Sequence, residues 1–252
     1  MKTNMSLRAG RAFLIFLGFI GGQVLGAAWA AIIGVIIAAL GGMDLSNTEA
    51  VGALKKMIAA PSMITGFIAG GIAMIFLSFH FAGDRLRDGS PTGAAWRVGS
   101  LKQLLEGILS GSLIAFSCLL LFSLVFPASP ESRKIGPVAE MAMTGGITRM
   151  LWLFLALILA PPVEELLFRG VLLGGFRSSF GPVGSATAVT LLFVLLHLTE
   201  VVYYWPALIG IFSLAVVTLW LRLRSGTIGP AIAAHFCYNA FIAMAVIKLY
   251  PR

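Results

Sequence analysis

Long apolar runs, separated by short polar connections, make up most of this chain. Seven runs approach or exceed the roughly 20 residues that an α-helix needs to cross a bilayer. They fall at residues 12–40, 61–82, 103–126, 147–176, 183–200, 206–222 and 227–248. The pattern predicts an all-α polytopic membrane protein, built as a bundle of about seven transmembrane helices.

The connections at 41–60 and 127–146 are rich in Gly, Pro, Ser and Thr, as loops are. A short surface helix at 137–143 would bring the number of helices to eight. We expect the whole chain to form a single integral membrane domain. Within it, residues 1–130 would supply the first three spans, and residues 145–250 would supply the last four.

The first run follows the segment MKTNMSLRAGR, which resembles the start of a signal peptide. The run from Ala12 to Leu40 is too long for the apolar part of a signal peptide, so we expect an uncleaved transmembrane helix. Glycines recur in it every four residues, at Gly18, Gly22 and Gly26. This spacing predicts close packing against a neighbouring helix.

Composition favours a membrane protein over one that binds nucleic acid. The chain is 59% hydrophobic and 11% charged, whereas soluble domains carry about 25% charged residues. Its net charge of +8 comes from lysines and arginines in the connections, which are typical cytoplasmic anchors. Cys118 and Cys237 lie far apart in apolar segments, so we expect two buried thiols and no disulfide framework.

Seven spans place most of the basic residues on one side of the membrane. These residues are Lys2, Arg8, Arg11, Arg85, Arg87, Arg97, Lys102, Arg177, Arg222 and Arg224. Opposite loops carry Lys55, Lys56, Arg133 and Lys134. The positive-inside rule therefore predicts a cytoplasmic N-terminus and an external C-terminus. The short connections are typical of prokaryotic proteins, and we expect this one in the plasma membrane.

Three polar motifs interrupt the apolar segments of the second half. They are APPVEELLFRG, with Glu164, Glu165 and Arg169; FVLLH, with Phe193 and His197; and HFCYN, with His235 and Asn239. Ionisable groups inside membrane spans are costly and are usually functional. Counted from the predicted membrane face, Glu164, His197, His235 and Asn239 all lie roughly 12–20 Å deep. A similar depth is what one site built from several helices requires.

The two glutamates are expected to have different roles. Glu165 and Arg169 are four residues apart with the acid first, which favours an ion pair on one helix face. Glu164 lies about 140° around the helix from Arg169, so it would remain the reactive carboxylate. The alternative is that both acids only neutralise Arg169. Pro161 and Pro162, just before the glutamates, would free backbone groups there.

These residue types suit the hydrolysis of a peptide bond. A carboxylate in a poorly solvated cavity can act as a base near neutral pH, so Glu164 would deprotonate a water that His197 helps to hold. His235 and the Asn239 amide would stabilise the tetrahedral oxyanion. No triad pattern with a nucleophilic Ser or Cys is needed, which favours direct attack by water. Taken singly, each histidine could be a core residue, and His235 with Asn239 could be a clamp between helices.

The three motifs resemble those of the CPBP family, which comprises the type II CAAX prenyl endopeptidases and the Rce1-like and bacteriocin-processing (Abi) proteases. EELLFR is similar to the family's EExxxR motif, FVLLH to FxxxH, and HFCYN to HxxxN. The resemblance covers about residues 145–245. It implies an all-helical intramembrane endopeptidase with a cavity open to the cytoplasmic side. It also implies that the chemistry is carried by Glu164, His197, His235 and Asn239, with Phe193, Glu165 and Arg169 completing the motifs.

Metal dependence is the open chemical question. Glu164, His197 and His235 could compose a zinc site, and the family was long described as metalloproteases. The HExxH motif is absent, however, and a three-ligand zinc site would need a separate base. Glu165 could be that base only by leaving Arg169. We therefore expect a glutamate mechanism with no metal or other cofactor.

Two other functions remain open from the residues alone. A proton-coupled transporter could use Glu and His residues near the midplane as a relay, but the HxxxN pair has no evident use there. A catalytically silent scaffold would hold other membrane proteins and would not depend on Glu164 or His235. The expected partners are the lipid bilayer and a membrane-associated, in some cases lipidated, protein or peptide substrate; no oligomeric state is predicted.

Overall fold

The computed structural model describes residues 7–126, 140–141 and 146–249. Within these residues all regular structure is helical, which confirms the predicted all-α class. Six helical stretches there are long and apolar enough to cross a membrane: Ala9–Leu40, Thr48–Arg85, Leu101–Val125, Gly146–Leu196, Ala207–Ser225 and Gly229–Lys248. The predicted surface helix at 137–143 lies outside the described residues, except for the helical pair 140–141.

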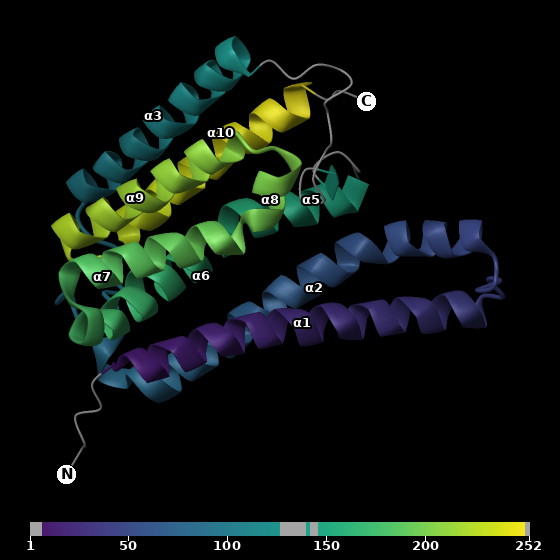
Figure 1. Cartoon of the computed structure of the whole chain (residues 1–252), viewed down its shortest axis with the longest axis horizontal. Coiled ribbons are helices and arrows are strands. Elements are labelled where there is room, and N and C mark those ends of the chain that lie inside the picture. The colour runs from purple at the N-terminus through teal and green to yellow at the C-terminus, as the bar shows by residue number, and fades with distance from the viewer. Residues whose placement is uncertain (1–6, 127–139, 142–145, 250–252) are drawn as a thin grey trace. The chain divides into compact units, whose positions relative to one another are not determined.

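The fourth stretch, Gly146–Leu196, folds back on itself and supplies two of the predicted spans. The backbone leaves the helical region at Gly181 (φ 67°, ψ −174°), directly before Pro182. Phe168 and Phe193 lie on opposite sides of this break, yet their ring centroids are 5.2 Å apart. The stretch is therefore a helical hairpin (Figure 1). The predicted runs at 147–176 and 183–200 are its two arms.

The hairpin is built from several segments with different helical windings. The first arm contains α5 (Gly146–Phe154), the π-helical η2 (Leu155–Leu159), α6 (Ala160–Glu165) and the π-helical η3 (Leu166–Leu172). Helix α7 (Leu173–Leu196) includes the turn and forms the second arm. Wider π turns are frequent at functional sites because they displace backbone and side chains from the α register.

The chain divides into two compact units, and Phe13–His80 forms one of them. It contains most of α1 (Ala9–Leu40) and α2 (Thr48–Ala82). A side chain at Gly22 would lie 2.8 Å from the Gly70 Cα, and one at Gly26 would lie 2.8 Å from the Thr65 carbonyl. The predicted close packing at the glycine repeat is confirmed, because only a missing side chain allows the backbones to approach so closely.

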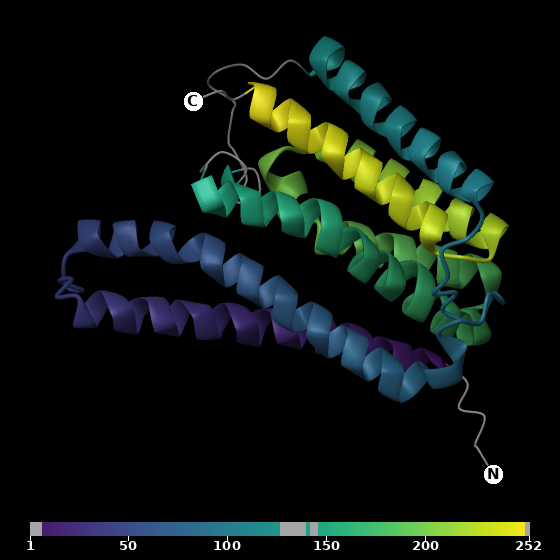
Figure 2. The same cartoon turned by 180° about the vertical axis from the view of Figure 1, so that it is seen from behind.

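The other unit comprises the N-terminal segment to Ala12 and residues 81–252. Besides the hairpin it holds η1 (Gly83–Arg85), α3 (Leu101–Val125), α8 (Leu198–Tyr203), α9 (Ala207–Ser225) and α10 (Gly229–Leu249). Helix α10 packs against α3, α9 and α6, and Figure 2 shows α3 alongside it. The third span therefore packs with the last four, whereas the predicted division near residue 130 grouped it with the first two.

Basic segments meet at one end of this unit. Arg222 is buried and donates through Nη2 to the carbonyls of Ser90 (3.0 Å) and Gly93 (2.9 Å). Arg97 donates to the Gly226 carbonyl at 3.0 Å. The loop between η1 and α3 is thus fastened to the α9–α10 turn. Arg97 and Arg222, two of the basic residues predicted on one side of the membrane, therefore lie in the same part of this unit.

Candidate active site

The residues singled out from three motifs lie together in the larger unit. Glu164 in α6 places its Oε2 3.8 Å from His197 Nε2 and 3.9 Å from His235 Nε2. His197 lies between α7 and α8, and His235 lies in α10. Glu164 and His235 are buried. One carboxylate therefore faces two imidazoles that come from separate helices.

Glu165 has partners of its own, which differ from those of Glu164. Its Oε2 lies 3.3 Å from Arg169 Nε, and its Oε1 lies 2.9 Å from His235 Nδ1. No direct hydrogen-bond partner reaches the buried Oε2 of Glu164 among the described residues. The Glu165–Arg169 ion pair is the one expected from their spacing along the helix, whereas the Oε2 of Glu164 faces the two imidazoles at longer range. The bond to His235 was not foreseen.

Arg169 is held by aromatic and backbone groups as well as by Glu165. Its Nη2 donates to the carbonyl of Ala215 in α9 at 3.0 Å. Its guanidinium carbon lies 4.4 Å from the ring centroid of Phe193, a cation–π distance. The centroid of the Phe193 ring lies 4.5 Å from that of the His197 ring and 5.9 Å from that of the His235 ring. The Phe193 ring therefore packs against both imidazoles and the guanidinium.

Hydrogen bonds orient both histidine rings in the same sense. The Nδ1 of His197 lies 2.8 Å from the Phe193 carbonyl, so it carries the proton and donates. The Nδ1 of His235 donates to Glu165 in the same way. Each ring therefore turns its Nε2 toward Glu164. His197 ends α7 with non-helical angles (φ −99°, ψ 16°), and its side chain is 22% exposed, so it marks the more open side of the site.

The structure gives Asn239 a partner in the hairpin. In the π-helical register of η2, the Ala160 N–H donates to the Leu155 carbonyl. The next donor in that register would be residue 161, which is a proline and has no N–H. Asn239 Nδ2 instead donates to the Ala156 carbonyl at 2.9 Å. The Asn239 amide thus replaces the backbone N–H that Pro161 lacks. Its second N–H stays available for another acceptor.

This pairing leads to a prediction about stability. Asn239→Ala is expected to destabilise the protein by about 1–3 kcal/mol, because it leaves the Ala156 carbonyl without its donor. Pro161→Ala restores the backbone N–H that could donate to the Ala156 carbonyl. In the double variant the loss should therefore be smaller than the sum of the two single effects. Thermal unfolding of the four proteins in one detergent measures this coupling, and strictly additive effects would refute the assignment.

Two site features could not be recognised among the motifs beforehand. The carbonyl of Ala215 accepts from Arg169, and the carbonyl of Ala156 accepts from Asn239. Backbone acceptors carry no residue signature in a sequence. The Pro161–Pro162 pair was the available signal, since two missing N–H groups imply carbonyls that need other donors.

The described residues contain no group of three His, Cys, Asp or Glu side chains with the geometry to hold a metal ion. The zinc alternative would use Glu164, His197 and His235 as ligands and would need a separate base. Glu165 is already bound to Arg169 and His235. A zinc site made of these three ligands would therefore lack an unengaged carboxylate to act as its base.

The second half of the chain is similar to a known protein family. Residues 146–241 match the family model described as type II CAAX prenyl endopeptidase Rce1-like. The matched segment starts at the first residue of α5 and ends in α10 just after Asn239, so it contains the hairpin and every site residue named above. No curated protein matches the chain significantly. No solved structure does either.

Proposed function

Since the segment 146–241 is Rce1-like, we propose that this integral membrane protein is an intramembrane endopeptidase of the CAAX type. Its substrates would be membrane-associated or lipidated proteins or peptides. The observation that carries the proposal is the position of the Glu164 Oε2, buried and 3.8–3.9 Å from the Nε2 atoms of both histidines. These separations are too long for hydrogen bonds, so this oxygen is left to bind a water molecule during the reaction.

In the proposed reaction, Glu164 takes a proton from a bound water molecule. The oxygen of that water attacks the carbonyl carbon of the substrate. The C–O bond forms as the carbonyl π bond opens, which gives a tetrahedral oxyanion. When the C–N bond breaks, the proton passes from Glu164 to the departing amine. The products are a carboxylate and an amine, and no acyl-enzyme forms. His197, anchored through Nδ1 to the Phe193 carbonyl, orients the water through Nε2.

Stabilisation of the oxyanion falls to His235 and Asn239. The Glu165 carboxylate accepts a hydrogen bond from His235 Nδ1 and fixes the orientation of that ring, as a buried carboxylate does in other hydrolases. In its doubly protonated form the ring can donate through Nε2 to the oxyanion. The second N–H of Asn239 can donate alongside it. The first remains on the Ala156 carbonyl and fixes the amide in place.

The function is tested by comparing membrane proteomes of cells that express the wild type or Glu164→Gln at equal levels. We expect membrane-associated fragments with new C-termini that are present with the wild type and absent with the variant. A scaffold would give identical fragment patterns and an unchanged phenotype in Glu164→Gln and His235→Ala cells. The same result would also exclude a proteolytic role for this site.

We also propose that the reaction is metal-free. The support is chemical: a zinc site made from Glu164 and the two histidines would leave only Glu165 as the base, and that carboxylate has two partners. Purified protein should therefore cleave substrate at full rate after dialysis against a strong chelator. Zinc at one equivalent per chain, with activity lost on its removal and regained on its return, would contradict the proposal.

The orientation is likewise proposed from the basic end of the larger unit. Arg97, Arg222 and the loop that they fasten lie together there. By the positive-inside rule this end would face the cytoplasm. The N-terminus would then be cytoplasmic in the plasma membrane of a prokaryote.

A further inference from the structure

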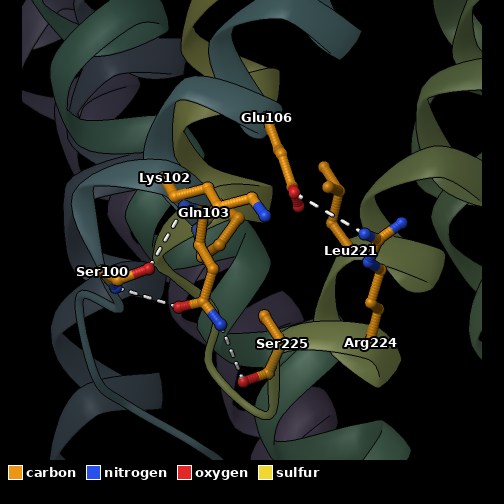
Figure 3. Close-up of a pocket in the computed structure, with 8 residues that line it drawn as sticks. Ser100, Lys102, Gln103, Glu106, Leu221, Arg224 and Ser225 are labelled. Carbon is orange, nitrogen blue, oxygen red and sulfur yellow. Dashed lines mark hydrogen bonds and ion pairs between the residues drawn. The ribbon is translucent and has the colours of Figure 1, made fainter.

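A second polar site lies at the basic end of the larger unit. It is a pocket of about 240 Å³ where the start of α3, the end of α9 and the start of α10 meet (Figure 3). Lys102, Gln103 and Glu106 line it from α3, and Arg224 and Ser225 line it from α9. None of these residues belongs to the three motifs, and the proposed proteolysis does not use them.

The charges in this pocket favour an anionic ligand. Figure 3 shows Lys102, Glu106 and Arg224 extending into the same space. Arg224 Nη2 lies 3.6 Å from Glu106 Oε1, so the carboxylate offsets one of the two cations and one positive charge remains. Gln103 Nε2 donates to the Ser225 carbonyl at 3.5 Å and ties the two helices together beneath the cations. A lysine and an arginine that line the same pocket are well suited to a phosphate group.

The pocket lies at the ends of helices that are long enough to cross a membrane. Lys102 and Arg224 lie in the terminal turns of two helices that are long and apolar enough to span a membrane. The Arg224 guanidinium lies 5.1 Å from the ring centroid of Trp220. Tryptophan is enriched at the headgroup level of membranes. Basic pockets between membrane helices are known sites for acidic headgroups.

Apolar surface for the acyl chains continues from the same pocket. Leu105, Leu109 and Leu113 follow at four-residue spacing on α3 and are 49%, 69% and 66% exposed. Leu113 also lines an apolar groove of about 340 Å³ that includes Ile209 of α9. This groove begins about 16 Å along the helix from Lys102, close to the roughly 15 Å depth of one leaflet. A free phosphate ion would leave this apolar surface unused.

We propose that this pocket binds the headgroup of an anionic phospholipid, with the acyl chains lying along α3 toward the groove shared with α9. The phosphate would be held by Lys102 and Arg224, and Gln103 would hold the two helix ends at the spacing that the headgroup requires. This inference is independent of the proposed protease activity.

The test is a lipid titration of the purified full-length chain in detergent, followed by native mass spectrometry. Phosphatidylglycerol should bind at least tenfold more tightly than phosphatidylcholine of the same chain length. Lys102→Gln and Arg224→Gln should each weaken phosphatidylglycerol binding about fivefold, the effect of one charge near a lipid surface. Arg87→Gln is the matched control, because this exposed arginine lies in the same basic loop region but outside the pocket, and it should bind like the wild type.

Three results would overturn the proposal. One is equal weakening by Arg87→Gln, which would mean that only the overall charge of this end matters. Another is equal affinity for the two lipids. The third is displacement of the lipid by soluble glycerol 3-phosphate at an equal concentration, which would identify a free-anion site. If Arg224→Gln unfolds because Glu106 loses its partner, Lys102→Gln decides the outcome, since Lys102 has no role in that ion pair.

Discussion

Glu164→Gln is expected to lower the rate of peptide-bond cleavage by about 10²- to 10⁴-fold, the usual contribution of a general base. Glutamine keeps the size and shape of the side chain but cannot accept the proton of the attacking water. The Oε2 of Glu164 has no direct hydrogen-bond partner among the described residues. The substitution should therefore leave the unfolding temperature unchanged or slightly raised. Initial rates in proteoliposomes, at equal amounts of folded protein, measure the effect.

Glu200→Gln is the matched control for this prediction. Glu200 lies in the first turn of α8, which begins directly after His197, so it is a nearby carboxylate outside the proposed reaction. The cleavage rate of the Glu200→Gln variant should stay within about threefold of the wild-type rate, because the Glu200 side chain contacts no reacting atom. If Glu164→Gln kept more than a tenth of the wild-type rate, or if both variants lost activity equally, Glu164 would not be the base.

The second large effect is expected on stability, at the buried pair Glu165–Arg169. Arg169→Met or Glu165→Gln alone should each lower the free energy of unfolding by about 3–5 kcal/mol, because each leaves a buried charge without its partner. The two side chains are 0–1% exposed. Glu165→Gln should also loosen His235, since the carboxylate holds that ring through Nδ1. Unfolding induced by heat or denaturant in mild detergent measures these losses.

The double variant and a surface pair make this prediction specific. Glu165→Gln with Arg169→Met should be more stable than either single variant, because no uncompensated charge remains. Arg85 and Asp88 form a shorter ion pair (2.7 Å), but their side chains are 35% and 25% exposed. Arg85→Met should cost no more than about 1 kcal/mol. Additive losses at the buried pair, or equal losses at the two pairs, would show that burial does not govern the effect.

The membrane spans could be predicted because hydrophobic length alone decides whether a helix can cross a bilayer. The break between the fourth and fifth spans was also visible, since Gly181 and Pro182 interrupt the apolar pattern. Which helices pack together was harder to predict. Residues 107–125 carry no charged side chain, so hydrophobic periodicity does not show which neighbour they meet. The available signal was the pair Gly107 and Gly111, whose missing side chains allow close approach to the start of α10.

The candidate site was predictable in its residue types but not in its pairings. Ionisable side chains are so costly in apolar segments that Glu164, His197 and His235 stand out at once. Spacing along one helix also gave the Glu165–Arg169 pair, which the structure contains. Contacts between helices have no such rule. The bonds from His235 to Glu165 and from Asn239 to the Ala156 carbonyl depend on how α10 lies against the hairpin.

The most direct measurement is the mass of the purified enzyme, quenched with acid while it turns over a peptide substrate in H₂¹⁸O. A Glu164-activated water attacks the peptide bond directly, so we expect ¹⁸O in the new C-terminal carboxylate and an enzyme mass that stays unchanged throughout turnover. An enzyme whose mass rises by that of the acyl fragment, or a wild-type protein that cleaves no peptide under conditions where it is folded in lipid, would contradict it.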